Sequence, residues 1–229
     1  MGLKEGGLRG SLRNVSAGVS AIPDSVVVRY DASELELSDG DVVDSWPDSS
    51  DNQFGLTGTS EPIYREDQIN GLPTVHFDGS DNRLEEDSFS QQQPCAVSAV
   101  VRTNDTGNSQ YISDSNGNRQ IAAIVDGGDT QSGPGAFAGS WLDGGSDPGT
   151  NYRVISWIFD EGSSEVRIDG GTDISGNAGG DPADDGIVIG GGSGNATSYL
   201  DGEIAEYLRV DDITDVPDAE DYLSSKWGV

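Results

Sequence analysis

Apolar side chains recur at every second position in short segments of this chain, and turn-forming residues separate those segments. The clearest segment covers residues 95–102, in which Cys95, Val97, Ala99 and Val101 share one face. Because successive side chains of a strand point to opposite faces, this pattern predicts a β-strand with a buried face. We expect further strands over residues 26–31, 73–77, 111–112, 121–125, 136–142, 152–159, 166–169, 187–189 and 200–210.

Three of these segments predict more than a strand. Residues 152–159 are apolar on both faces, which is typical of a central strand that is covered on both sides. Asn116-Gly117, between residues 111–112 and 121–125, indicates a hairpin turn. The last strand is expected to turn four apolar residues to one face, namely Leu200, Ile204, Leu208 and Val210.

A helix is predicted only at the C-terminus. Asp215 can cap its start, Pro217 suits its first turn and Gly228 can end it. The apolar residues at helical spacing are Ala219, Tyr222, Leu223 and Trp227. Many short strands and one terminal helix predict an all-β fold, an antiparallel β-sandwich or jelly roll that forms one domain over residues 25–229.

Residues 1–24 differ from the rest of the chain and are expected to form an extended arm. They hold three basic and two acidic residues, whereas the remainder holds nine basic and 39 acidic residues. The apolar residues at steps of three and four, which we assign to assembly, are Leu8, Leu12, Val15 and Val19. We predict that this arm anchors the chain in an oligomer or a larger particle; the alternative is a disordered terminus.

Acidic residues outnumber basic ones so strongly that the charge limits the medium. The chain has 12 basic and 41 acidic residues, a formal net charge of −29, and its only lysines are Lys4 and Lys226. In dilute buffer this charge repels itself, whereas at molar salt the Debye length falls to about 3 Å. The composition therefore predicts a hypersaline medium. A partly disordered acidic protein is the alternative, and the periodic apolar segments argue against it.

The same sequence argues against several kinds of partner. Nucleic acid and anionic membranes need clustered lysine and arginine, which this chain lacks. No apolar stretch approaches the roughly 20 residues of a membrane span, and the N-terminus has no secretory signal. We therefore expect synthesis in a cytoplasm, followed by retention there or by release through lysis or another route. Cys95 is the single cysteine, which excludes an internal disulfide, and it is expected to be buried.

Three blocks of the sequence carry a recognisable pattern in chain order. They are VRYDASELELSDGDVVDSWPDSSD at 28–51, INGLPTVHFDGSDNRL at 69–84, and residues 201–228 with GEIAEYLRVDD and YLSSKWG. Together these blocks resemble concanavalin A-like, laminin-G-like jelly-roll modules. The resemblance implies two antiparallel sheets, one of them concave, with ligands bound on rim loops or on the concave face.

The arm carries a second resemblance. Residues 1–25, MGLKEGGLRGSLRNVSAGVSAIPDS, are similar to the start of structural proteins from haloarchaeal tailed viruses and proviruses. This resemblance implies a virion protein, which is made in the host cytoplasm and released by lysis. It agrees with the acidic composition.

An acidic cluster in the last strand raises the question of catalysis, because glucanases with a jelly-roll fold use such a cluster. Glycoside hydrolysis needs two carboxyls across the scissile bond. In a strand without a bulge, alternation is expected to place Asp201 and Glu203 on one face and Glu206 on the other, so we predict that the chain is not an enzyme. His76 is the only histidine, which excludes a zinc site built from several histidines, and a structural role is expected for it.

The candidate binding residues are fewer. Trp141 and Asp143 lie at a strand end beside a glycine-rich loop, and we assign them to glycan or partner binding. A core position for Trp141 is the alternative, and we expect it for Trp46, Trp157 and Trp227. Calcium is a candidate metal, with ligands from the loop of Asp44, Asp48 and Asp51 or from Asp78 and Asp81, because it prefers carboxylate oxygen and laminin-G-like modules often bind it near rim loops. No other cofactor is expected.

These observations favour a virion structural protein of a haloarchaeal virus, such as a tail fibre, turret or capsid decoration. A homotrimer or homopentamer held by the arm would contact other virion proteins and project the jelly roll into the hypersaline medium. Linked copies would bind a host-surface glycan or S-layer protein through avidity. A cellular haloarchaeal adhesin or lectin is the alternative, and a glycoside hydrolase is less favoured.

Overall fold

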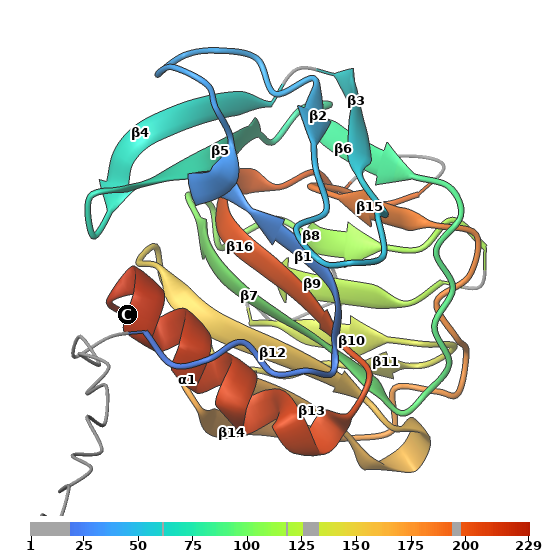
Figure 1. The fold of residues 1–229 in the computed structure, drawn as a ribbon. Helices are drawn as coiled ribbons and strands as arrows, with labels where there is room; N and C mark the ends of the chain where they lie inside the picture. Colours follow the sequence, from blue (N-terminus) through green and yellow to red (C-terminus); the bar gives the residue numbers. More distant parts are fainter. Residues whose placement is uncertain (1–18, 61, 118, 126–132, 194–197) are drawn as a thin grey trace, which may run out of the picture.

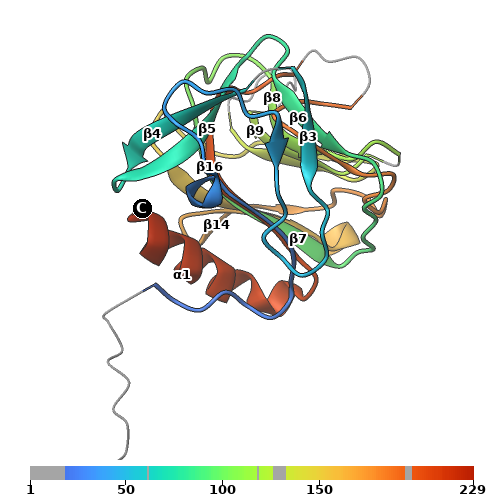
Figure 2. The same cartoon turned by 45° about the horizontal axis from the view of Figure 1, so that its top comes forward.

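In the part of the chain that the structure describes, two antiparallel sheets of eight strands face each other, and one α-helix lies outside them (Figure 1). The structure is a computed structural model that describes residues 19–60, 62–117, 119–125, 133–193 and 198–229. We call the sheet that packs against the helix sheet A and the other sheet B. Figure 2 shows the layers in turn, with β3, β6, β8 and β9 of sheet B above, β7 and β14 of sheet A beneath them, and then α1.

Sheet A contains the longest strands of the molecule. Its order is β14 (Gly171–Gly176), β13 (Ser164–Ile168), β12 (Arg153–Phe159), β7 (Cys95–Thr103), β16 (Asp201–Val210), β5 (Leu72–Asp78) and β4 (Ile63–Ile69). The eighth strand, β1 (Val26–Asp31), pairs with the second half of β16, whereas β5 pairs with the first half.

Sheet B is built from shorter strands. Its order is β11 (Trp141–Leu142), β10 (Gly135–Phe137), β9 (Ile121–Val125), β8 (Gln110–Asp114), β15 (Ile187–Ile189), β6 (Arg83–Glu86), β3 (Leu56–Ser60) and β2 (Ser45–Trp46). Single 3-10 turns lie at Ala32–Glu34, Glu161–Ser163 and Ile213–Asp215, and the last of them leads into α1 (Val216–Trp227).

The central strands of sheet A are buried on both faces, and this explains their apolar sequences. Between the sheets, the fully buried side chains include Tyr30, Trp46, Phe77, Trp157 and Tyr207. A second core, between sheet A and α1, contains Val100, Val154, Leu208, Leu223 and Trp227. No helix within the described residues is long and apolar enough to span a membrane.

The structure confirms most of the predicted elements. The all-β antiparallel sandwich with a C-terminal helix is as expected, and β1 and β15 have the predicted bounds. In β7, the odd-numbered residues from Cys95 to Val101 face the core between the sheets. The central strand predicted over 152–159 is β12, which is covered on both faces.

The differences fall where strands are short or polar. The segment 136–142 is two strands, because the chain turns between β10 and β11 at Gly139, whose φ of 101° favours glycine. Five strands were not predicted, namely β2, β3, β4, β6 and β14. They lack a clear apolar alternation, so pairing with neighbouring strands defines them.

The helix begins and ends close to the predicted residues. Pro217 lies in its first turn, and Gly228 ends it at a φ of 74°. Asp215, however, makes no side-chain capping hydrogen bond. Asp212 caps the preceding 3-10 turn instead, because its carboxylate accepts a hydrogen bond of 3.0 Å from the Thr214 amide.

Candidate functional site

A β-bulge in β16 decides where the acidic cluster of this strand points. The pairing of β16 with β7 shifts between Ile204 and Glu206, so that Ala205 is an extra residue. Ile204 faces the core between the sheets, whereas Leu208 faces α1. The prediction that Leu200, Ile204, Leu208 and Val210 share a face is therefore wrong, because one extra residue reverses the alternation.

The same bulge corrects the expected placement of the carboxylates. Glu203 pairs across the sheet with His76 and Arg102, and all three lie on the outer face of sheet A. Glu206 lies beyond the bulge and also points to the outer face, where it contacts α1. Glu203 and Glu206 therefore share a face rather than lying on opposite faces.

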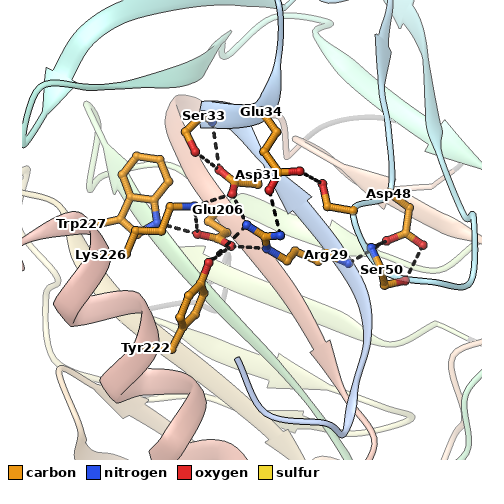
Figure 3. A network of polar contacts seen from close by, with 11 residues as sticks. Arg29, Asp31, Ser33, Glu34, Asp48, Ser50, Glu206, Tyr222, Lys226 and Trp227 are labelled. Atoms are coloured by element: carbon orange, nitrogen blue, oxygen red, sulfur yellow. Dashed lines mark hydrogen bonds and ion pairs between the residues drawn. The ribbon is translucent and has the colours of Figure 1, made fainter. Parts of the chain in front are cut away.

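Glu206 is the centre of a buried polar network beneath α1 (Figure 3). One carboxylate oxygen accepts hydrogen bonds from Arg29 Nε at 2.7 Å and from the Tyr222 hydroxyl at 2.8 Å. The other accepts from Lys226 Nζ at 2.8 Å and from Trp227 Nε1 at 2.7 Å. Because these donors come from β1 and α1, the network fastens both elements to β16.

The network is balanced in charge, which makes its burial tolerable. Asp31 also contacts both Arg29 and Lys226, so two buried carboxylates face two cations, and the exposed Glu34 pairs with Arg29 from outside. Burial acts to lower the pKa of Arg29, but the hydrogen bond and charge of Glu206 outweigh it and raise that pKa. Glu206 is fully buried, so this half of the sheet is a structural joint that a ligand does not reach.

Glu203 lies on the same face and is also buried, but its contacts are with side chains of sheet A and of Tyr152 rather than with α1. Arg102 binds it with two hydrogen bonds, Nε–Oε2 at 2.7 Å and Nη2–Oε1 at 2.8 Å, and the Tyr152 hydroxyl also donates to it. His76 Nδ1 lies 3.6 Å from Oε1. Burial acts to raise the pKa of Glu203, but these partners outweigh it and lower that pKa to about 2. Glu203 is thus an ionised carboxylate held by positive and hydroxyl partners.

Beside Glu203 lies an open hollow of about 630 Å³, which we call the Arg65 hollow. Its polar lining residues are Ser60, Arg65, His76, Asp78, Asp81 and Asn82, and Ile63 completes it. It therefore brings the two predicted calcium ligands next to the only histidine.

The two aspartates of this hollow serve a turn. One Asp78 oxygen accepts hydrogen bonds from the backbone of Ser80 at 2.9 Å and of Asp81 at 3.4 Å. Gly79 has a φ of 73°, and a Cβ there would lie 2.8 Å from the Asp201 Cβ, so glycine is required. Among the described residues no three histidine, cysteine or acidic side chains are grouped to hold a metal ion, and a calcium site at Asp78 and Asp81 stays a prediction.

On the opposite side of the sandwich, Trp141 belongs to a group of three aromatic side chains, which we call the aromatic row. The ring of Trp141 lies 5.2 Å from that of Phe137 and 6.1 Å from that of Tyr111. Neighbouring residues of Phe137 and Tyr111 face the core, so the row lies on the outer face of sheet B. Arg119 extends it, with its guanidinium 5.9 Å from the Tyr111 ring centre.

Trp141 is accessible in a way that the other tryptophans are not. It is 38% exposed, whereas Trp46, Trp157 and Trp227 are fully buried, as predicted for those three. Asp143 is exposed close by in the chain. The structure thus leaves Trp141 open to a ligand, and its assignment to glycan binding, together with that of Asp143, stays a prediction.

The remaining candidates are placed as follows. Of the predicted assembly residues, Leu8, Leu12 and Val15 lie outside the described residues, and Val19 is half exposed. Residues 19–24 run alongside α1 (Figure 2). The amide of Ser20 donates a hydrogen bond of 2.9 Å to the hydroxyl of Ser225 in that helix.

Sequence reasoning missed the partners of each site. Tyr111, Phe137 and Arg119 surround Trp141, and Arg65 lines the hollow of His76 and Asp78. Tyr111 and Arg119 are distant from Trp141 in sequence, whereas Phe137 lies in the adjacent strand of the same hairpin. Outward-pointing aromatic residues in the predicted strands at 111–112 and 136–142 were the available signal for two of them.

Comparison with known proteins supports the fold. No family model and no curated protein sequence matches this chain. Among solved structures, domain 4 of AbnA, a GH43 extracellular arabinanase from Geobacillus stearothermophilus solved with arabinotriose, is similar with a TM-score of 0.58 and 17% identity. The match covers 81% of this chain and 99% of that domain.

Two further structures share the architecture. The receptor-binding domain of botulinum neurotoxin type G has a TM-score of 0.55 at 14% identity, covering 86% of this chain and 51% of that one. An arabinofuranosidase solved with arabinofuranosyl-alpha-1,2-xylobiose has a TM-score of 0.55 at 11% identity, covering 80% and 51%. This chain thus spans about half of those two chains, and it has the lectin-like β-sandwich fold.

Proposed function

We propose that this chain is a non-catalytic, lectin-like module that binds carbohydrate through the aromatic row of sheet B. The observation that carries the proposal is the position of Trp141, which is 38% exposed beside two further aromatic rings. Large amphipathic rings supply much contact area with few rotatable bonds, so they are favoured at binding surfaces. The arabinanase domain of similar fold was solved with arabinotriose, which supports a sugar as the ligand.

The carboxylates of β16 support binding rather than hydrolysis. A glycosidase needs one carboxyl that protonates the leaving group and a second that attacks or activates water. Glu206 is fully buried beneath α1, and Glu203 is held by Arg102 and Tyr152 with its pKa lowered to about 2. A carboxyl with a pKa near 2 is a poor proton donor at neutral pH.

The biological setting is a further part of the proposal. A net charge of −29 with two lysines suits a hypersaline medium, and residues 1–25 resemble haloarchaeal virus proteins. We propose that several copies project from a virion and bind a host-surface glycan or S-layer protein through avidity. Mass spectrometry of purified haloarchaeal virions and of host envelopes tests this setting, because a protein found only in envelopes would be a cellular adhesin instead.

Tryptophan fluorescence tests the binding site directly. Trp141 is the only exposed tryptophan of the four, so a bound sugar should change its emission and protect it from a soluble quencher. We expect a saturable response to arabinotriose or another oligosaccharide of a glycan panel at molar NaCl. Trp141→Ala should abolish binding, and Trp141→Phe should retain part of it because a ring remains.

Val229→Ala is the matched control, since Val229 is an apolar residue that is also 38% exposed but lies beyond α1. It should bind as the wild type does. Glycan binding that is unchanged in Trp141→Ala would overturn the aromatic row as the site. Release of reducing sugar that is lost in Glu203→Gln would overturn the non-catalytic assignment.

A further inference from the structure

We propose that the Arg65 hollow is a second saccharide site, which takes neutral sugars through a pair of adjacent hydroxyl groups. It lies on the outer face of sheet A at the β4–β5 edge, whereas the aromatic row lies on sheet B toward the β11 edge. The inference rests on the proposed carbohydrate binding but uses a different surface. The chain would then carry two sites on opposite sides of one sandwich.

The unusual feature of the hollow is its arginine. The described residues include nine basic side chains, and seven of them form ion pairs with carboxylates, namely Arg29, Arg83, Arg102, Arg119, Arg153, Arg167 and Lys226. Arg209 is buried, where it binds the Gln120 amide oxygen at 2.6 Å. Arg65 is half-buried and has no partner among the described side chains. No described side chain therefore occupies its guanidinium donors, which can bind a ligand in the hollow.

The carboxylate of Glu203, which lies outside the hollow, orients the ring of His76. Glu203 lies 3.6 Å from His76 Nδ1, and Glu203 is itself fixed by Arg102 and Tyr152. Because Nδ1 faces this carboxylate, Nε2 is the ring nitrogen that remains for a ligand. Glu203 thus acts as a positioning residue for His76 and does not itself line the hollow.

The mixture of charges selects the ligand class. Asp78 and Asp81 would repel a carboxylate or phosphate ligand, and Arg65 would repel a metal ion or an amine. A sugar hydroxyl both donates and accepts a hydrogen bond, so adjacent hydroxyls can accept from Arg65 and donate to an aspartate at the same time. One Asp78 oxygen serves the turn, which leaves its second oxygen for the ligand. A neutral polyhydroxyl compound is therefore the class that suits all of these groups.

The single histidine makes the test specific. His76 is the only histidine of the chain, so its imidazole protons give one set of NMR signals that report on the hollow. We expect arabinose, galactose, glucose or mannose to shift these signals saturably at molar NaCl and constant pH. Sodium acetate and calcium chloride at the same ionic strength should not. A saturable shift with acetate or calcium and none with the sugars would overturn the proposal, as would no shift at all.

Variants separate this site from the aromatic row. Arg65→Ala should weaken the sugar-dependent imidazole shift by about tenfold or more, because a hydrogen bond from a charged group is lost. Arg167→Ala is the matched control, since Arg167 lies in β13, four strands from β5 in sheet A, and pairs with Glu165 and Glu220. It should leave the shift unchanged, as should Trp141→Ala.

The outcomes distinguish the two proposals. If Trp141 fluorescence responds to sugar and the imidazole signals do not, the second site is wrong and the proposed function stands. If the imidazole signals respond and Trp141 does not, the aromatic row is wrong and the second site stands. The wild-type titration decides this even where Arg65→Ala fails to fold.

Discussion

The outer face of sheet A has two halves that use the same residue type for opposite purposes. Glu206 is sealed beneath α1 with Arg29, Lys226, Tyr222 and Trp227 around it (Figure 3). Glu203, three residues earlier on β16, lies outside the helix cover and faces the Arg65 hollow through His76. Both glutamates are buried, and they differ in what covers them: α1 at Glu206, and side chains next to the hollow at Glu203.

The network beneath α1 also contains a lysine. Lys226 is the lysine within the described residues, and its side chain is 13% exposed between Asp31 and Glu206. Lysine has a compact ammonium on a flexible stem, and here that group bridges two carboxylates on the inner side of the helix. The exterior, by contrast, carries most of the acidic excess.

Removal of the Glu206 charge should have the largest effect on stability. Glu206→Gln leaves Arg29 and Lys226 with Asp31 as their one buried carboxylate partner, and breaking a buried ion pair costs about 3–5 kcal/mol. Urea unfolding at constant molar NaCl measures this loss. The control is Glu34→Gln, because Glu34 pairs with the same Arg29 but is 51% exposed, and its loss should cost less than about 1 kcal/mol. Equal losses would show that burial does not matter here.

Removal of the Glu203 charge should cost less and should depend on pH. The pKa of Glu203 falls from 4.5 to about 2 on folding, so its stabilisation is complete above pH 4.5 and disappears as the pH falls toward 2. We expect Glu203→Gln to lower the free energy of unfolding by up to about 3 kcal/mol at pH 7. The difference from wild type should shrink steadily in urea titrations between pH 5 and about pH 2. A difference that stays constant would contradict the lowered pKa.

Salt should have the smallest effect on the stability difference between the wild type and Glu206→Gln. Dilution from molar to about 0.1 M NaCl lengthens the Debye length to about 10 Å and should destabilise the wild type through repulsion among exposed carboxylates. The buried Glu206 network is screened much less, so the stability difference between wild type and Glu206→Gln should change by less than about 0.5 kcal/mol. Urea titrations of both proteins over a salt series measure this. A difference that grows strongly at low salt would mean that the network is open to solvent.

The sequence alone was sufficient to predict the fold class, because burial of a strand or helix places apolar residues at regular intervals in the sequence. The alternation of Cys95, Val97, Ala99 and Val101 predicted a strand, and Gly228 marked the end of the helix. Strands such as β4, with the sequence IYREDQI, carry no such period. They are defined by hydrogen bonds to a neighbour, which single-sequence patterns do not record.

The sites depended on tertiary structure for a different reason. Trp141 and Asp78 were visible as candidates, but the rings beside Trp141 and the arginine beside Asp78 come from other strands. One extra residue, Ala205, turns Glu206 to the same face as Glu203, and a bulge depends on pairing with β7 rather than on local preference. Composition and period thus determined that this chain forms an acidic sandwich with a closing helix. Strand pairing alone decided which charges meet, because register assigns every side chain to one face or the other.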